Sequence, residues 1–171
     1  MTAPLVFVVP GPAIGKGRPR VGKVGNHARL FTPPKTVNYE GLVALAAAQA
    51  MQGRPLIEGP VAVSIDISCQ IPESWSRRKK QDAVNHVVLP TTKPDIDNVE
   101  KALFDAMNGV VWVDDVQVVN VSKRKRYAAT PGVRIAVMPA LGGDDLSAGM
   151  GTEAAPLQRS LIETKEQAAT V

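Results

Sequence analysis

The sequence is poor in cysteine and in aromatic residues. Its one cysteine, Cys69, excludes an intramolecular disulfide framework and a cysteine-rich zinc site. Cys69 lies in an alternating apolar run, which predicts a small core residue. Aromatic residues make up 4% of the 171 residues, so the core must be built mainly from valine, leucine, isoleucine and alanine.

Long hydrophobic runs are also missing. Nothing in the sequence approaches the roughly 18 consecutive apolar residues of a membrane-spanning helix. No basic N-terminal segment leads into a long apolar stretch, as it would in a secretory signal. We therefore expect a soluble, cytoplasmic protein with no membrane partner, and the length fits one domain with a sizeable core.

The net charge of +4 is unevenly distributed along the chain. Residues 140–171 carry two basic and five acidic side chains, a balance of −3, which leaves +7 on residues 1–139. Glycines interrupt the C-terminal part, and no apolar periodicity runs through it. We predict a folded domain at 1–139 and a flexible acidic tail at 140–171. The basic domain fits a polyanionic partner or an ordinary solvated surface.

Hydrophobic periodicity predicts a single α+β domain. Strands are expected at 5–9, 60–71, 116–127 and 133–138, the last two as a hairpin, and helices at 36–53, 75–84 and 97–109. Between the first strand and the first helix, residues 11–35 form a long Gly-, Pro- and basic-rich connection. The order β–α–β–α–α–β–β is typical of one mixed sheet of about four strands with helices packed on it.

The helix expected at 97–109 has a recognisable start and buried face. Asp97 is predicted as its N-cap, with Glu100 at the capping-box position three residues later. Helical spacing predicts a buried stripe of Val99, Leu103, Ala106 and Val110.

Carboxylates gather just before this helix. In an extended segment residues i and i+2 project to one side, so Asp95 and Asp97 are expected to face one point while Ile96 turns to the core. Two carboxylates held so close repel each other unless a cation lies between them, and hard oxygen ligands suit Mg²⁺ or Mn²⁺. Lys101 follows one helical turn later, and the next loop can return Asp115 to the same place.

Each of these features also has a plain structural interpretation. Asp97 can serve only as a helix cap, Lys101 and Asp105 can form an exposed ion pair, and Asp114-Asp115 can be a hydrophilic turn. Caps and turns do not explain why Asp95 stands beside Asp97. Three carboxylates, a lysine and a divalent cation together suit phosphodiester hydrolysis.

Two blocks of sequence resemble the RusA family of Holliday-junction resolvases. The central block is Pro94-Asp95-Ile96-Asp97-Asn98 with Lys101, Asp105, Gly109 and Asp114-Asp115-Val116-Gln117. The N-terminal block is Gly15-Lys16-Gly17-Arg18-Pro19-Arg20, followed by Phe31-Thr32-Pro33 and Tyr39-Glu40. The likeness runs from about residue 4 to residue 138, and its central motif is the more specific.

The resemblance implies a homodimeric endodeoxyribonuclease that binds four-way DNA junctions and nicks two strands, in DNA recombination and repair. It implies Mg²⁺ or Mn²⁺ as cofactor, with Asp95, Asp97 and Asp115 as metal ligands and Lys101 as the catalytic lysine. Two alternatives remain: a non-catalytic DNA-binding accessory protein, and a metal-dependent nuclease acting on linear nucleic acid. The stretch 110–112 is either core or subunit interface.

Basic side chains cluster in three other segments. Lys16, Arg18 and Arg20 lie in the Gly-rich connection, where they are expected to contact the DNA backbone. The run 123–126 on a strand suggests an edge or a strand end, with charges that discourage pairing or bind DNA. The run 77–80 on a helix is a solvated face or a phosphate-binding surface.

Overall fold

The computed structural model describes residues 4–25 and 27–140 and confirms the predicted α+β class. A mixed four-stranded sheet has the order β1 (Leu5–Pro10), β6 (Gly132–Pro139), β4 (Val61–Gln70), β5 (Val118–Ala128). β6 pairs antiparallel with both of its neighbours, and β4 pairs parallel with β5. The predicted tail, beyond Ala140, lies outside the described residues.

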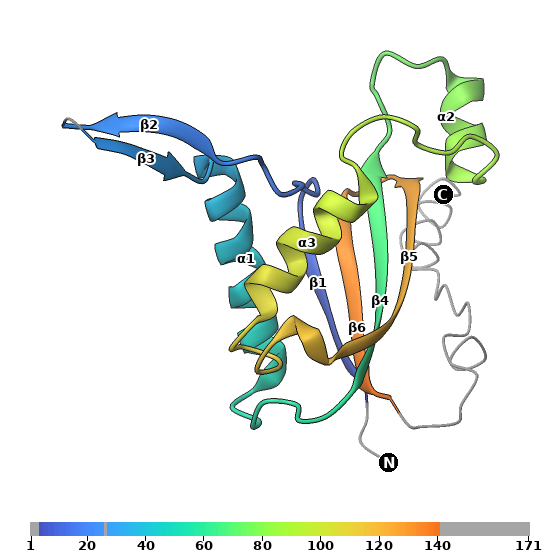
Figure 1. The fold of residues 1–171 in the computed structure, drawn as a ribbon. Helices are drawn as coiled ribbons and strands as arrows, with labels where there is room; N and C mark the ends of the chain where they lie inside the picture. The colour runs from blue at the N-terminus through green and yellow to red at the C-terminus, as the bar shows by residue number, and fades with distance from the viewer. Residues whose placement is uncertain (1–3, 26, 141–171) are drawn as a thin grey trace, which may run out of the picture.

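The core lies between the sheet and two helices that cover one of its faces (Figure 1). α1 (Pro34–Met51) buries Tyr39, Val43 and Ala47 at helical spacing. α3 (Ile96–Met107) buries the predicted Val99, Leu103 and Ala106. β4 is central in the sheet, and its Val61, Ala62 and Val63 are all buried.

The stretch between α3 and β5 belongs to this core. Val111 and Trp112 are fully buried, and the Trp112 ring packs edge-on against Phe104 with 5.6 Å between ring centroids. The indole Nε1 donates a hydrogen bond of 2.7 Å to Asn108 Oδ1, which satisfies the one polar atom of that side chain. The core alternative is therefore correct for Val111 and Trp112, and Val110 is partly buried against the same core.

The strands differ from the prediction in two places. The connection 11–35, in which no strand was predicted, contains an antiparallel ribbon of β2 (Arg20–Val24) and β3 (His27–Phe31), which forms a sheet of its own (Figure 1). The last two strands do not form a hairpin. β4 lies between β5 and β6, so the segment joining them passes over a strand. β5 is nonetheless an edge strand, as the charges at 123–126 suggested.

The start of α3 also differs from the prediction. Its N-cap is Asp95, with φ −72° and ψ 137°, and the first helical hydrogen bond runs from Val99 N to Asp95 O at 3.1 Å. Asp97 therefore lies in the first helical turn and is not the cap. Asp95 and Asp97 do not share the extended segment in which alternate side chains face one side.

A short second helix contacts the edge strand β5. α2 (Arg77–Val84) begins at Ser76, whose side chain accepts a hydrogen bond from Lys79 N. Its arginines and Lys79 are exposed, and the Lys79 ammonium lies 3.9 Å from the centroid of the Trp75 ring. In the described part of the chain, no helix is both long and apolar enough to span a bilayer.

Candidate active site

One line along α3 carries two of the predicted catalytic side chains, Asp97 and Lys101. Asp97, Lys101 and Asp105 follow each other at intervals of four residues and so share one side of the helix. Asp97 and Lys101 are exposed, and Asp105 is half-buried, whereas the opposite side of α3 packs into the core. Asp95 lies at the start of this line, where its Oδ2 accepts a hydrogen bond of 3.1 Å from Asn98 Nδ2.

Lys16 joins this line to α1. Its ammonium lies 2.7 Å from Asp105 Oδ2 and 2.6 Å from Glu40 Oε1. Partial burial lowers the pKa of Lys16, but the hydrogen bonds and charges of Asp105 and Glu40 outweigh that effect and raise it. In this structure Lys16 therefore binds two carboxylates of its own chain, unlike a lysine of a freely solvated loop.

The backbone around Lys16 is fixed against α3. Lys16 N donates a hydrogen bond of 2.7 Å to Asn98 O, and Gly17 N donates one of 3.2 Å to Thr36 Oγ1 on α1. A Cβ atom at Gly15 would lie 2.9 Å from Asn98 Cβ, so only glycine allows this approach. The N-terminal motif and the central motif therefore meet in space.

Asp115 begins a short 3₁₀ helix, η1 (Asp115–Gln117), whose position is closely determined. Asp114 Oδ1 accepts from Val116 N at 3.0 Å, and Gln117 Oε1 accepts from Asp114 N at 3.2 Å, which together form a capping box. Gln117 Nε2 donates to Ile57 O and Gly59 O at 3.0 and 2.9 Å. The conspicuous Asp-Asp-Val-Gln sequence thus builds a rigid turn.

The Asp115 carboxylate has acidic neighbours. Partial burial raises its pKa, and so do the hydrogen bond and charge of Asp114 and the charge of Asp105. Asp115 is therefore near the C-terminal half of α3.

Asp95 precedes Asp105 by ten residues, a rise of roughly 15 Å along a helix axis. In residues 4–25 and 27–140, no three His, Cys, Asp or Glu side chains are placed as a ready metal site. The ligand set Asp95, Asp97 and Asp115 remains a prediction.

Two lysines of β5 hold α3 and the segment that leads into it. Lys125 Nζ donates hydrogen bonds to Thr92 O at 2.7 Å and to Pro94 O at 3.1 Å, directly before Asp95. Lys123 forms an ion pair with Glu100 of α3. On the other face of the strand, Arg124 pairs with Asp66 of β4. The basic run 123–126 therefore has intramolecular partners.

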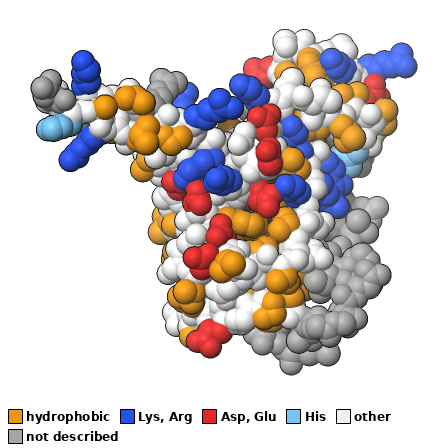
Figure 2. Space-filling model, viewed as in Figure 1, with side chains coloured by type: hydrophobic (Ala, Val, Ile, Leu, Met, Phe, Trp, Pro, Cys, Tyr) orange, Lys and Arg blue, Asp and Glu red, His pale blue; other side chains and the backbone are white. Residues whose placement is uncertain are grey.

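Cationic side chains border the acidic line. Figure 2 shows acidic side chains running down the face over α3, with lysine and arginine side chains on both sides and out along the β2–β3 ribbon. Arg18, Lys23, Arg29 and Lys35 are exposed on or beside that ribbon. An extended phosphate backbone could lie across this face with its charge balanced on either side of the acidic line.

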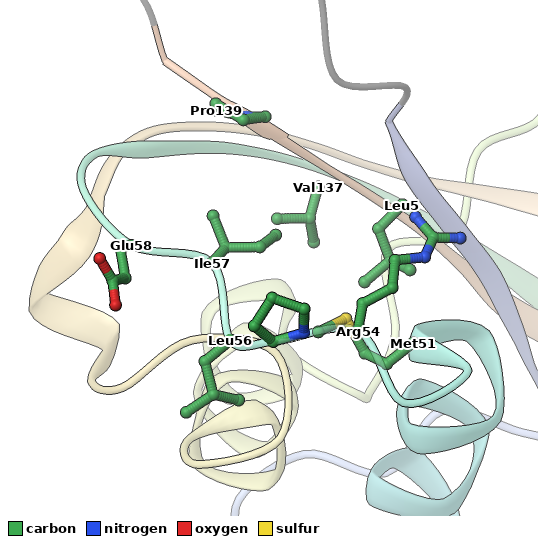
Figure 3. A pocket seen from close by; sticks show the side chains of 9 residues that line it. Leu5, Met51, Arg54, Leu56, Ile57, Glu58, Val137 and Pro139 are labelled. Atoms are coloured by element: carbon green, nitrogen blue, oxygen red, sulfur yellow. The ribbon is translucent and has the colours of Figure 1, made fainter.

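A cavity of about 340 Å³ lies near the start of β1 and the end of β6 (Figure 3). Its lining is mostly apolar and includes Leu5, Met51, Leu56, Ile57 and Val137, with Arg54 and Glu58 as the charged side chains. None of the predicted site residues lines it. This cavity is therefore separate from the open acidic face.

Sequence reasoning placed Glu40 and Asp105 in the family-like blocks but gave neither of them a role in the site, and it gave Lys125 none. Glu40 and Asp105 hold Lys16, and Lys125 holds the segment before Asp95. The spacing of Asp105, eight residues after Asp97 on a helix, already indicated that the two share one side. Lys125 carries no such signal, because it is 31 residues from Pro94.

Comparison with known proteins gives two matches. A family model described as Endodeoxyribonuclease RusA matches residues 10–138. A Bacillus subtilis (strain 168) protein named "Uncharacterized protein YqaN" is 34% identical over 133 residues, which are 77% of this chain and 93% of that protein. The matched region includes the ribbon, both helices that cover the sheet, and the whole acidic line.

Proposed function

The chain belongs to the RusA endodeoxyribonuclease family, and on this premise we propose that it resolves four-way DNA junctions in recombination and repair. The observation that carries the proposal is the exposed line of Asp97, Lys101 and Asp105 on a helix whose other side is buried. These three side chains do not contribute to the hydrophobic core, and the positive charges beside them complement the negative charge of a nucleic acid.

We propose that Asp95, Asp97 and Asp115 are ligands for Mg²⁺ or Mn²⁺. Because Asp115 lies near Asp105, roughly 15 Å along α3 from Asp95, the binding of one ion by all three would require Asp115 to approach the start of α3. The fit rests on donor chemistry: carboxylate oxygens are the ligands these ions prefer, and Asp115 stands among carboxylates whose mutual repulsion a cation would relieve. A bound divalent ion would supply charge to the scissile phosphate and lower the pKa of a water molecule.

The remaining roles fall to side chains of the same face. Lys101, one turn after Asp97, would place its ammonium against a phosphate oxygen and stabilise the charge that develops there. The motifs 93–101 and 114–117 contain no Ser, Tyr or Cys, so water is the proposed nucleophile. Lys16 would keep Asp105 and Glu40 neutralised beside the phosphate path, and Lys125 would keep Asp95 in place.

We further propose that the active unit is a homodimer. One chain carries one acidic line, whereas resolution of a four-way junction needs cuts in two opposing strands. A closed two-fold dimer presents two identical sites in the orientation that the symmetry of the junction requires. Residues 111 and 112 are buried within the chain, so the subunit contact must be formed by other residues.

The deciding experiment is cleavage of a synthetic four-way junction and of a linear duplex of matched sequence, each with and without Mg²⁺. The wild-type protein should cut the junction in paired positions and leave the duplex intact, and it should do so only with the metal. Asp97→Asn should abolish cleavage while junction binding persists. Asp82→Asn on α2, a matched loss of one carboxylate away from α3, should cut normally.

Other results would each reject part of the proposal. Equal cutting of junction and duplex would indicate a nuclease for linear DNA. Junction binding without cutting, in any divalent metal, would indicate an accessory protein. Normal cutting by Asp97→Asn would remove Asp97 from the site. Paired cuts in one binding event by a protein that sediments as a monomer would reject the dimer.

A further inference from the structure

The β2–β3 ribbon projects from the domain and presents both of its faces to solvent (Figure 1). Its five cross-strand pairs run from Arg20 opposite Phe31 to Val24 opposite His27. An isolated two-stranded ribbon has no core of its own and is only marginally stable in water. Its side chains are therefore available to a partner and are not needed to fill the core.

One face of the ribbon carries an apolar pair in the half nearer its base. Val21 and Leu30 are directly opposite each other, and their exposed fractions are 73% and 72%. Lys23 and Ala28, the other cross-strand pair on this face, lie closer to the tip. On the opposite face the Phe31 ring lies over Gly22, where an added Cβ would be only 2.7 Å from it. A bare apolar pair on a projecting ribbon is a liability unless something covers it.

The positive charge around this apolar pair favours a nucleic acid over a second copy of the chain as its partner. Residues 1–39 contain no aspartate or glutamate, whereas residues 16–35 contain six lysines and arginines. Arg18, Lys23, Arg29 and Lys35 are exposed. A second copy of the chain, docked ribbon to ribbon, would set these cations against one another. A nucleic acid offers both phosphates for the cations and base faces for the apolar pair.

The base of the ribbon is fixed beside the acidic line. The Lys16 backbone is hydrogen-bonded to Asn98 in the first turn of α3, and its ammonium reaches Asp105. DNA held by the ribbon is therefore held next to Asp97 and Lys101. Because two-stranded ribbons fit DNA grooves and apolar side chains can part stacked bases, ribbon and site can engage one DNA molecule together.

We propose that the β2–β3 ribbon enters the branch point of a four-way junction, where Val21 and Leu30 stack against the exposed faces of base pairs. This inference rests on the proposed function and adds the means by which branched DNA is selected. At a branch point the continuous stack is already interrupted, so unstacking costs less there than within a linear duplex. Arg18, Lys23 and Arg29 would contact the phosphates of the adjoining arms without reading sequence.

The test uses the full chain in EDTA and junctions that carry 2-aminopurine, a base whose fluorescence rises when it unstacks, at the branch point. Wild-type binding should raise the fluorescence. The double variant Val21→Ser/Leu30→Ser should lose the rise and bind the junction about tenfold or more weakly, the scale of one lost base stack. Its affinity for a linear duplex and the salt dependence of that affinity should not change.

Two control variants separate the apolar pair from the charges. Val87→Ser, at a residue 74% exposed in the segment after α2, should leave fluorescence and both affinities unchanged. Lys23→Ala/Arg29→Ala should weaken junction and duplex binding alike and reduce the slope of log K against log salt by about two, while the fluorescence rise at saturation persists. Unchanged thermal midpoints would show that all variants fold.

The proposal is overturned if the double serine variant keeps the fluorescence rise and the preference for the junction. It is also overturned if that variant sediments as a monomer where the wild type is a dimer, because the ribbon is then a subunit contact. Cleavage in Mg²⁺ is scored separately. If the wild-type protein unstacks the branch point but never cuts, the proposed nuclease function fails and the proposed role of the ribbon stands. If it cuts without unstacking, the role of the ribbon fails and the nuclease function stands.

Discussion

Replacing Asp115 with asparagine should stabilise the protein in metal-free buffer. Partial burial and the neighbouring carboxylates of Asp114 and Asp105 raise the Asp115 pKa in the folded state above its value in the unfolded chain. Stability is then lost as pH rises from the unfolded-state pKa through the raised folded-state pKa, and it stays lost at higher pH. Because Asp115 is partly solvated, the gain on removing its charge is at most about 1 kcal/mol, the size of a surface charge interaction.

The same substitution should have the opposite effect once the metal is present. An ion at 100 times its dissociation constant stabilises the wild type by about 2.7 kcal/mol, and the variant forgoes that gain when Asp115 is a ligand. For a chain of 171 residues, about 1 kcal/mol moves the midpoint by roughly 2–4 °C. The variant should therefore melt above the wild type in EDTA and below it in saturating Mn²⁺ or Mg²⁺.

Thermal unfolding followed by circular dichroism, in EDTA and across a metal titration, measures both effects. Asp82→Asn serves as the control, since it removes a carboxylate from α2 and should shift neither midpoint by more than about 2 °C, as expected of a surface substitution. A variant less stable than the wild type in EDTA would refute the repulsion among Asp105, Asp114 and Asp115. Equal stabilisation of wild type and variant by the metal would remove Asp115 from the ligand set.

Three further predictions concern the support of the site and the body of the domain. Lys125→Met removes two charged hydrogen bonds, to Thr92 O and Pro94 O, and should destabilise the fold by about 1–3 kcal/mol and slow cleavage. Lys125→Arg should restore part of the stability and part of the cleavage rate. Equal midpoints in urea unfolding for Lys125→Met and the wild type would contradict this prediction. Trp112→Phe leaves the half-buried Asn108 amide oxygen without its donor and should cost about 1–3 kcal/mol by the same measurement. A neutral result would show that the oxygen finds another donor. Removal of residues 141–171 should leave the thermal midpoint and cleavage unchanged. It should tighten duplex binding at low salt, because it removes a net charge of −3. A truncated protein that unfolds would contradict the predicted domain boundary.

The parts of the fold that follow from local periodicity could be predicted from the sequence. The buried stripe of α3 and the buried face of β4 appear as 3.6- and 2-residue repeats, which report directly on which side faces the core. The ribbon was missed because the basic and glycine residues of 11–35 obscured its short strands. Its signal was Gly25-Asn26 between Val24 and His27, a dipeptide typical of tight hairpins, and Gly25 has φ +62°.

The pairing of distant strands has no such local pattern in the sequence. The segment 128–132 is short enough for a hairpin between β5 and β6. Nothing in the local sequence indicates that β4, which begins more than 60 residues earlier, lies between these two strands. At the site, the spacing of Asp97, Lys101 and Asp105 could be predicted from the helix alone. The helix start could not, because Asp95 and Asp97 are equally good caps and the choice depends on how the chain leaves Pro94.

The place of β6 between β1 and β4 has a consequence for biosynthesis. During synthesis β1 emerges first, yet its partner residues at 132–137 are made more than 120 residues later, so until then β1 can rest only against α1. β4 and β5 can pair before that point, which leaves the nascent chain as two halves that the last strand must join. At a translation rate of roughly 5–20 residues per second, the open edges of β1 and β4 are exposed for several seconds. These two edges are where a chaperone would act, because unpaired strand edges are prone to aggregation until β6 pairs with both of them.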